Sequence, residues 1–321
     1  MHGAVVAERV REAWVDAMMR DRITGCAVGA AVGDALGMPL EFGPRRSEER
    51  LVREMQSGRL PAGTFTDDTE MALALADSLL AHSPLDPGDL AERFAGWYRA
   101  GPQDVGIHTG EVLRRIDTGQ PWQAAVAAVQ AQHPDSAGNG SVMRCWPVAL
   151  ACHGDADRLL HESRLQSRVT HPHRECVEGS AFLNLAVAQL IAATPIEGAI
   201  AHALSRVDLP PQARAAIQQA PHRSREELAN SGWVRHTLQS AIWGLCSTGS
   251  FEEAVVQVVN LGNDADTAGA VVGALAGAAY GLSAIPAAWR ARLRGEWPLG
   301  SGACFDEGRL AALADRLARV D

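Results

Sequence analysis

Glycine recurs at every fourth position in two apolar segments, and this spacing limits how the chain can fold. The first series is Gly25, Gly29, Gly33 and Gly37, and the second is Gly269, Gly273, Gly277 and Gly281. Residues four apart lie on one face of an α-helix, and glycine inside a helix costs roughly 1 kcal/mol relative to alanine. Close approach of two helix backbones would offset that cost. We therefore predict two tightly packed central helices, which could pack against each other.

Most of the remaining sequence also favours helices. Apolar residues recur with helical periodicity along most of the 321 residues, and alternating β-branched runs are nearly absent. This pattern predicts an all-α fold without strands, as a single compact many-helix domain over residues 21–321. Residues 1–20 are expected to form a separate N-terminal helical extension. This helix would be amphipathic, because Val5, Val10 and Trp14 lie on one apolar stripe along it. Further helices are expected at 24–37 and 141–153, with a loop at 295–305.

Charge and cysteine content exclude several classes of protein. The formal charge of −9 and the lack of a basic cluster argue against a nucleic-acid-binding surface. Six cysteines without a CxxC pair are typical of reduced thiols, which predicts a cytoplasmic location. Charged residues stand where a signal peptide would be apolar. Residues 268–289 are uncharged and long enough to cross a membrane, but they are rich in Gly and Ala and contain Pro286, so we expect a buried helix and no membrane span.

Two acidic clusters lie far apart in the chain, and each precedes an apolar helical run. The first acidic cluster is Thr66-Asp67-Asp68-Thr69-Glu70, and the second is Asn263-Asp264-Ala265-Asp266-Thr267. Carboxylates that gather in one place repel each other unless a cation lies among them, and Mg²⁺ prefers oxygen ligands. The alternative is that the acids cap helices, since Asp67 and Glu70 have capping-box spacing and Asp264 suits an N-cap. A cap needs only one oxygen, whereas each cluster offers more; both interpretations remain open at this point.

Other acidic and histidine residues have weaker signals. Asp34 stands near the end of its predicted helix, where the helix dipole disfavours an anion. Glu41 follows Pro39 in an extended stretch and could point into a pocket. His171, His173 and Cys176 suggest zinc ligands, but no fourth ligand is evident, so we do not favour zinc.

Taken in chain order, these motifs resemble the ADP-ribosylglycohydrolase family, most closely its dinitrogenase-reductase-activating, ADP-ribosylarginine-hydrolysing branch. The matching segments are Gly-Asp-Ala-Leu-Gly at 33–37 with Glu41, the first acidic cluster, Asp-Val-Gly at 104–106, Gly-Asn-Gly at 138–140, Met-Arg-Cys at 143–145, Thr170-His171, and the second acidic cluster with Gly269. The resemblance extends from about residue 20 to about residue 290. The two acidic clusters in this order are its most specific part.

The resemblance implies a metal-dependent hydrolase that removes ADP-ribose from modified arginine on a protein, with two divalent cations, Mg²⁺ or Mn²⁺. The metal ligands that it implies are Thr66, Asp67, Asp68, Asp264, Asp266 and Thr267. The ADP-ribose-binding residues that it suggests are Gly106, Ser136, Gly138, Asn139, Gly140, Ser141 and His171. Asp68 or Glu41 would act as general base. Asp104 would face the guanidinium of the substrate, although Ile107 stands close to where this branch tends to carry Asn.

Other functions stay open at the level of sequence. The protein could cleave serine-linked or small-molecule ADP-ribose conjugates, and Asp104 argues mildly for arginine instead. It could be an immunity protein that neutralises an ADP-ribosylating toxin partly by steric binding. It could also be a catalytically inactive relative with a structural role, against which the intact set of metal-ligand candidates argues.

Overall fold

The computed structural model describes residues 2–320, with side chains from residue 15 onward. The described part of the chain forms α1 (His2–Gly37), α2 (Asp67–Ala81), α3 (Pro87–Arg99), α4 (Ile107–Asp117), α5 (Trp122–Gln132), α6 (Trp146–Ala151), α7 (Ala156–Arg168), α8 (Arg174–Ile191), α9 (Ile196–Arg206), α10 (Pro211–Gln219), α11 (Val234–Ser247), α12 (Phe251–Val259), α13 (Ala265–Tyr280), α14 (Ala287–Arg292) and α15 (Glu307–Leu317). Short 3₁₀ helices are η1 (Met38–Leu40), η2 (Glu48–Arg50), η3 (Ala220–His222), η4 (Arg225–Glu227) and η5 (Leu282–Ala284). The fold is mostly helical, as the sequence predicts.

Helices α1 and α13 pack against each other along their glycine faces at the centre of the molecule. A Cβ atom built on Gly25 would lie 2.5 Å from the carbonyl oxygen of Gly277. Gly29, Gly33 and Gly37 face Gly273, Gly269 and Ala265 in the same way, which makes the pair antiparallel. The predicted glycine-faced helix pair is therefore confirmed. Gly281 alone differs, because it ends α13 with a φ of 86°.

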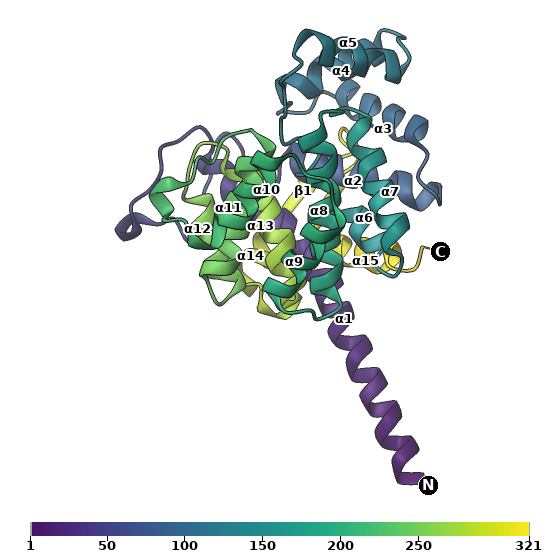
Figure 1. Ribbon diagram of the computed structural model, residues 1–321, viewed down its shortest axis with the longest axis vertical. Coiled ribbons are helices and arrows are strands. Elements are labelled where there is room, and N and C mark those ends of the chain that lie inside the picture. The colour runs from purple at the N-terminus through teal and green to yellow at the C-terminus, as the bar shows by residue number, and fades with distance from the viewer. Residues whose placement is uncertain (1, 321) are drawn as a thin grey trace.

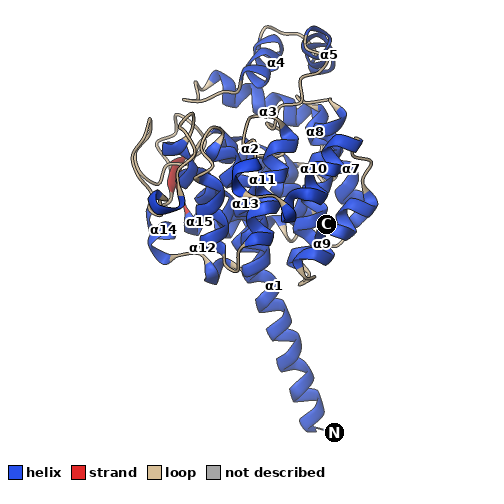
Figure 2. Ribbon diagram, turned by 60° about the vertical axis from the view of Figure 1, so that its left-hand side comes forward, coloured by secondary structure: helices blue, strands red, loops and turns tan. Residues whose placement is uncertain are grey.

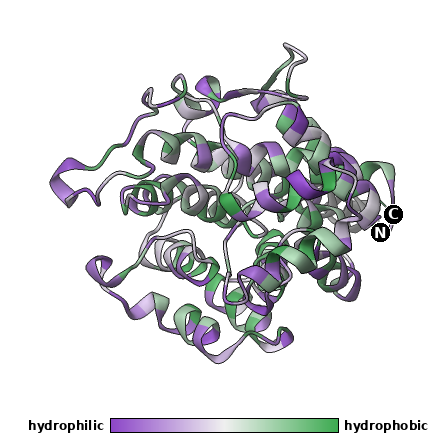
Figure 3. Ribbon diagram, turned by 90° about the horizontal axis from the view of Figure 1, so that it is seen from above, coloured by the Kyte–Doolittle hydropathy of each residue, from purple (hydrophilic) through white to green (hydrophobic). Residues whose placement is uncertain are grey.

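The other helices surround this pair. Helices α8, α11 and α12 pack on α13, α15 packs on α1, and α2 contacts α3 and α6. Figure 1 shows α3, α4 and α5 at one end of the body and the N-terminal part of α1 extending from the opposite end. In Figure 3 many outer loops are hydrophilic, while apolar residues lie on the helices between them. The antiparallel arrangement brings the C-terminal end of α1 and the start of α13 together, and the pocket described below forms there.

Some expectations about local structure are wrong. Helix α1 is continuous through residue 20, so no break separates the predicted helical extension over residues 1–20 from the predicted helix 24–37. The predicted helix 141–153 is shorter, because α6 begins only at Trp146 after a series of turns. The predicted absence of strands also fails: β1 (Arg294–Glu296) and β2 (Cys304–Asp306) form a small antiparallel hairpin within the expected loop (Figure 2). The predicted apolar stripe on residues 1–20 falls largely on side chains outside the described residues.

One described segment, Val15–Leu40, is long and apolar enough to cross a membrane by length and composition alone. It belongs to α1, and 94% of its most apolar window is buried inside the fold. Packing against α13 therefore accounts for its apolar character. Residues 268–289, considered from sequence, form α13 and the segment after it, and α13 is buried almost throughout. All six cysteines are free thiols.

Candidate active site

A cavity of about 460 Å³ opens where α2, α4 and α13 begin, just beyond the C-terminal end of α1. Twelve of the residues predicted from sequence line it: Glu41, Asp67, Asp68, Asp104, Gly106, Gly138, Asn139, Gly140, His171, Asp264, Asp266 and Thr267. These residues come from segments up to 226 positions apart, since Glu41 and Thr267 contribute to the same wall. The fold thus joins the two acidic clusters into one site.

Asp34 holds the first acidic cluster in place. This carboxylate is fully buried near the end of α1 and accepts four hydrogen bonds from the start of α2. Thr66 donates its backbone N–H at 3.0 Å and its hydroxyl at 2.8 Å, and Thr69 donates its N–H at 3.2 Å and its hydroxyl at 2.6 Å. Asp34 thereby satisfies amides that a cap would otherwise satisfy, which explains an acid near the end of a helix.

The structure does not support the interpretation that the side chains of the two acidic clusters cap their helices. Thr66 and Asp264 are the N-cap residues of α2 and α13, and neither side chain makes a capping hydrogen bond. The capping-box partner Glu70 instead accepts a 2.7 Å hydrogen bond from the indole of Trp97. The carboxylates of Asp67, Asp68 and Asp264 are therefore left facing the cavity rather than engaged with their own helices.

Direct contacts connect the two clusters. The Oδ2 atom of Asp68 lies 3.4 Å from the hydroxyl of Thr66 and 3.4 Å from the hydroxyl of Thr267, which is 199 residues away. The side-chain amide of Asn139 donates to Asp264 and also to the hydroxyl of Thr237, at 2.8 Å. The Gly-Asn-Gly turn is thus attached to the second cluster.

Burial makes the charged state of these acids costly. Loss of solvent is the first cause that raises the pKa of Asp34 and of Asp264 to about 7 and that of Asp266 to about 6. The pKa values of Asp67 and Asp68 are raised well above their usual range by the same burial and then by neighbouring carboxylates. Repulsion of this kind is relieved when a cation lies among the acids.

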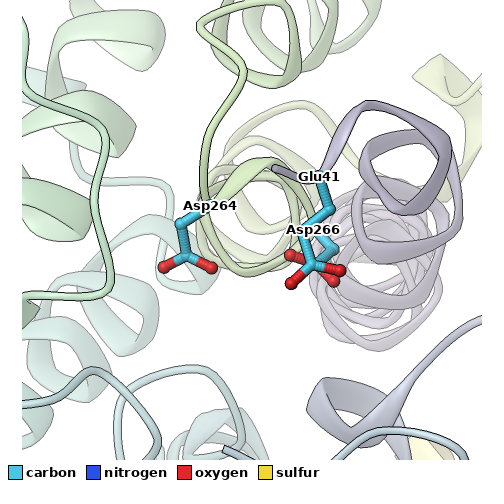
Figure 4. Close-up of side chains that lie close together, drawn as sticks. All are labelled: Glu41, Asp264 and Asp266. Atoms are coloured by element: carbon cyan, nitrogen blue, oxygen red, sulfur yellow. The ribbon is translucent and has the colours of Figure 1, made fainter. Parts of the chain in front are cut away.

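Observations within the site fit divalent cations. One oxygen each of Glu41, Asp264 and Asp266 lie within 4.8 Å of one another, and Figure 4 shows Glu41 and Asp266 directed to the same point, with Asp264 beside them. The Oδ1 atom of Asp68 is buried and has no hydrogen-bond partner. The donors are carboxylate and hydroxyl oxygens, the ligand type that Mg²⁺ and Mn²⁺ prefer.

A guanidinium group from the chain itself lies on the acidic wall. Arg59, in the loop before α2, forms ion pairs with Glu41, with Asp104 and, at 3.3 Å, with Asp266. The Asp104 side chain is 28% exposed at the mouth of the cavity. Asp104 thus lies where a guanidinium is held, although here the group belongs to Arg59.

His171 lines the cavity together with the Gly-Asn-Gly turn. Its ring packs against that of His108, with centroids 4.6 Å apart and the ring planes tilted by 36°. A Cβ atom on Gly140 would lie 2.7 Å from the imidazole of His171, so only glycine fits there. Burial, then the positive charges of His108 and Arg144, keep the pKa of His171 well below its usual value, and the ring is neutral.

Three predicted site residues do not line the cavity. Thr66 lies behind Asp68 and contacts it through its hydroxyl. Ser136 lies 3.5 Å from His108 Nδ1, one residue removed from the wall. Ser141 is fully buried, and its hydroxyl contacts Ser167 and Ser180 in the core.

The zinc interpretation has no support among the described side chains. The ring of His173 accepts a hydrogen bond from the amide of Glu175 and so caps α8. The thiol of Cys176 donates to the carbonyl of Gly138. Arg144, next to Cys145 in sequence, is buried, contacts Thr170 at 2.7 Å and stacks over Phe94, so its role is structural.

Several residues at the site were not predicted as site residues from sequence. Arg59 lies in a loop without any motif, Phe42 is 81% exposed at the edge of the cavity, and Ile107, noted only as a departure from the branch pattern, is 86% exposed there. Asn230 donates to the carbonyl groups of Gly262 and Asp264 and so fixes the turn before α13. The sequence showed that Asp34 is unusual near a helix end. It did not show the four hydrogen bonds that Asp34 accepts, because their donors, Thr66 and Thr69, belong to a distant segment.

The mostly helical fold thus gathers two acidic clusters around one carboxylate-lined cavity, and the comparisons with known proteins identify this arrangement as that of a glycohydrolase. The sequence profile of the ADP-ribosylglycohydrolase family matches residues 16–321, and the chain belongs to this family. Among curated relatives, an ADP-ribosylarginine hydrolase Tri1 of Pseudomonas putida is 34% identical over 280 residues, covering 84% of this chain and 73% of the relative.

Two further relatives and one solved structure are also similar to this chain. An ADP-ribosyl-[dinitrogen reductase] glycohydrolase of Rhodospirillum rubrum is 34% identical over 285 residues, covering 86% of this chain and 91% of the relative. Human ADP-ribosylhydrolase ARH3 is 26% identical over 334 residues, covering 85% and 89%. A solved structure described as an ADP-ribosylglycohydrolase-related protein complex superposes with a TM-score of 0.76 at 36% identity, covering 94% of this chain and 98% of the other.

Proposed function

We propose that this protein hydrolyses the N-glycosidic bond between ADP-ribose and an arginine side chain of a protein, and that it does so with two bound divalent cations, Mg²⁺ or Mn²⁺. The observation that carries the proposal is the position of Asp104, at the mouth of the cavity and on the same acidic wall as Asp266. A carboxylate suits a guanidinium by charge and by paired hydrogen bonds. Relatives named ADP-ribosylarginine hydrolase and ADP-ribosyl-[dinitrogen reductase] glycohydrolase support the same substrate.

The two acidic clusters would hold the cations through Thr66, Asp67, Asp68, Asp264, Asp266 and Thr267. Bound cations would polarise ribose hydroxyls and lower the pKa of water. Asp104 orients the scissile bond by holding the guanidinium. We assign Glu41 as general base, since Asp68 is engaged with Thr66 and Thr267 whereas Glu41 approaches the cavity from a separate segment.

In the reaction a water oxygen bonds to the anomeric carbon of the ribose as the carbon–nitrogen bond breaks. The transition state has oxocarbenium character, which the surrounding carboxylates stabilise. Glu41 takes a proton from the water, and arginine leaves with the electron pair of the broken bond as a neutral guanidine. The guanidine then takes up the proton that Glu41 removed and becomes a guanidinium paired with Asp104. The products are free ADP-ribose and unmodified arginine, and the reaction would take place in the cytoplasm, where the six free thiols stay reduced.

The first test is release of ADP-ribose from an arginine-ADP-ribosylated protein with Mg²⁺ and then with EDTA. We expect release that depends on the metal and is lost in Asp67→Ala. Asp104→Ala should lower kcat/KM by at least 100-fold, while Asp117→Ala, which changes a half-exposed acid at the end of α4, should leave it unchanged. Full activity of Asp104→Ala would contradict the assigned role.

The same assay separates the alternatives. Release of ADP-ribose is also measured from a protein that carries ADP-ribose on serine, because relatives named ADP-ribosylhydrolase ARH3 match this chain as well. Cleavage of the serine linkage alone would overturn the proposed substrate. An immunity function would require binding to an ADP-ribosyltransferase toxin, which a pull-down with Asp67→Ala tests without catalysis.

A further inference from the structure

Arg59 is the one cation among the described side chains that forms ion pairs with the acids of the cavity. Its guanidinium reaches Glu41, Asp104 and Asp266 at once, and its side chain is only 29% exposed. The remaining ion pairs of the described chain lie outside the cavity. The position of Arg59 is therefore a feature of the site itself.

The three partners of Arg59 are the groups that the reaction needs. Glu41 and Asp266 belong, with Asp264, to the group of carboxylates able to hold a metal ion. Asp104 is the acid to which the proposed function assigns the guanidinium of the substrate. A guanidinium and a divalent cation repel each other at these distances, and Asp104 cannot fully engage two guanidinium groups. Arg59 therefore competes with the divalent cations and with the guanidinium of the substrate for the same carboxylate oxygens.

The Arg59 side chain can leave by changing its own rotamer. Residues 56–59 face solvent for much of their surface, although Gly58 packs on Pro39, and Met55 and Gly63 on either side are buried. The loop is fixed beyond these points by an isolated bridge between Thr64 and Arg294 and by a hydrogen bond from the indole of Trp289 to the carbonyl of Arg53. Movement of Arg59 thus requires no change in the core.

We propose that Arg59 is an internal substitute for the cations of the site, which neutralises the acidic wall and occupies the guanidinium position until divalent cations displace it. A cation held by Asp266 lies beside Glu41 and repels the guanidinium, so that Arg59 loses two of its three partners and Glu41 becomes free to act as base. The third, Asp104, then becomes free for the arginine of the substrate. This last step rests on the proposed function, whereas the competition with cations does not.

The test compares Arg59→Gln with Arg53→Gln, a matched control in the same loop whose guanidinium pairs with Glu253 at 2.6 Å, outside the cavity. Binding of Mn²⁺ is measured by titration calorimetry at fixed ionic strength, without substrate. We expect Arg59→Gln to bind Mn²⁺ about tenfold more tightly than the unmodified protein, Arg59→Lys to fall between them, and Arg53→Gln to be unchanged. Equal or weaker binding by Arg59→Gln would overturn the proposal.

Kinetics supply a second, separate readout. At saturating Mn²⁺, Arg59→Gln should show a KM for an arginine-linked substrate that is equal to or lower than that of the unmodified protein. A severalfold higher KM would instead make Arg59 a substrate-binding group and would contradict displacement. If no arginine-linked substrate is cleaved but Mn²⁺ binding tightens, the proposed function fails while the competition between Arg59 and cations stands.

Discussion

Asp34 organises the candidate active site without lining the cavity. Its two carboxylate oxygens accept four hydrogen bonds, two from Thr66 and two from Thr69, in a fully buried position. An acceptor of this kind cannot be replaced by an amide, because one end of the amide is a donor. Asp34 is accordingly a positioning residue, which acts through the first acidic cluster.

We expect Asp34→Asn to lower the free energy of unfolding by about 2–3 kcal/mol, since at least one buried donor loses its acceptor. It should also weaken Mn²⁺ binding, because the start of α2 is no longer fixed. Denaturant unfolding and calorimetry measure the two effects. Asp157→Asn, at a side chain that is 92% exposed, is the control and should change neither. An unchanged unfolding free energy in Asp34→Asn would contradict this role.

His171 predicts a dependence of stability on pH. Its pKa in the folded protein lies well below its usual value, mainly through burial. The unfolded chain therefore binds the proton first as pH falls, and the stability that neutral His171 contributes is present above about pH 6.5 and is lost below it. Between pH 7.5 and 5.5 this amounts to about 1 kcal/mol.

Urea unfolding at pH 7.5 and 5.5 tests this prediction with His171→Gln. The variant should lose about 1 kcal/mol less than the unmodified protein over this interval. His161→Gln changes an exposed histidine on α7 and should behave like the unmodified protein. Identical pH dependence of all three proteins would show that His171 is not the titrating group.

At the scale of elements, the contact between α1 and α13 carries the clearest prediction. A Cβ atom on Gly33 would overlap the backbone of Gly269, which no rotamer change relieves. We expect Gly33→Ala to lower the free energy of unfolding by at least 3 kcal/mol through overpacking and separation of the helices. Thermal and denaturant unfolding measure it.

Gly96→Ala on α3 is the matched control, with the opposite expected sign. Its added Cβ would meet only the end of the Arg99 side chain, at 3.7 Å. Alanine in a helix with free space stabilises by roughly 0.5–1 kcal/mol. If both substitutions destabilise equally, close helix approach is not the cause.

How far the elements could be predicted depends on the range of the interactions that form them. The glycine series encodes a contact between residues 228 to 252 positions apart, from Gly37 with Ala265 to Gly25 with Gly277, because each series on its own needs a partner face. The hairpin of β1 and β2 has three residues per strand, too few for periodicity to reveal. The break expected near residue 20 is absent. Residues 15–20 are mostly exposed, and no glycine or proline interrupts the helix between residues 4 and 24, so α1 continues through this stretch.

Whether a residue of the site could be predicted also depends on whether its role follows from local sequence or from long-range contacts. The acidic clusters were predictable because their carboxylates are local motifs with a chemistry of their own, whereas the Gly-Asn-Gly turn was assigned to the site only through the resemblance to the family. Arg59 was not, because nothing near it in sequence indicates that it contacts Asp104 and Asp266. The side chain of Ser141, next to the turn, faces the core, and only the backbone path decides that orientation.

At the scale of the whole molecule, two exposed apolar residues border the cavity. Phe42 and Ile107 are 81% and 86% exposed, and Phe42 has a left-handed backbone with a φ of 59°. Such a conformation costs about 1–3 kcal/mol for a bulky residue and is characteristic of functional positions. Both residues stand where the polypeptide around a modified arginine would contact the enzyme.

We expect Phe42→Ala and Ile107→Ala to raise KM about fivefold or more for an ADP-ribosylated protein, and to leave KM for free ADP-ribosylarginine unchanged. The reason is that only the protein substrate covers the edge of the cavity. Steady-state kinetics with both substrates measure the difference. Met18→Ala, at an exposed residue on α1, is the control. Equal effects on both substrates would place the two residues in the ADP-ribose site instead.

The glycine contact between α1 and α13 also has a consequence for the cation-free protein. The carboxylates of the site stand where the two most closely packed helices meet it, so a group of mutually repelling acids adjoins the rigid centre of the fold. If the site holds divalent cations as proposed, their removal leaves Arg59 as the one positive partner of these acids among the described side chains. The turn before α13 should then exchange its amide hydrogens faster, while the start of α2, held by Asp34, and the middle of α1 stay protected. Loss of the cations would thus loosen the site without unfolding the helix pair.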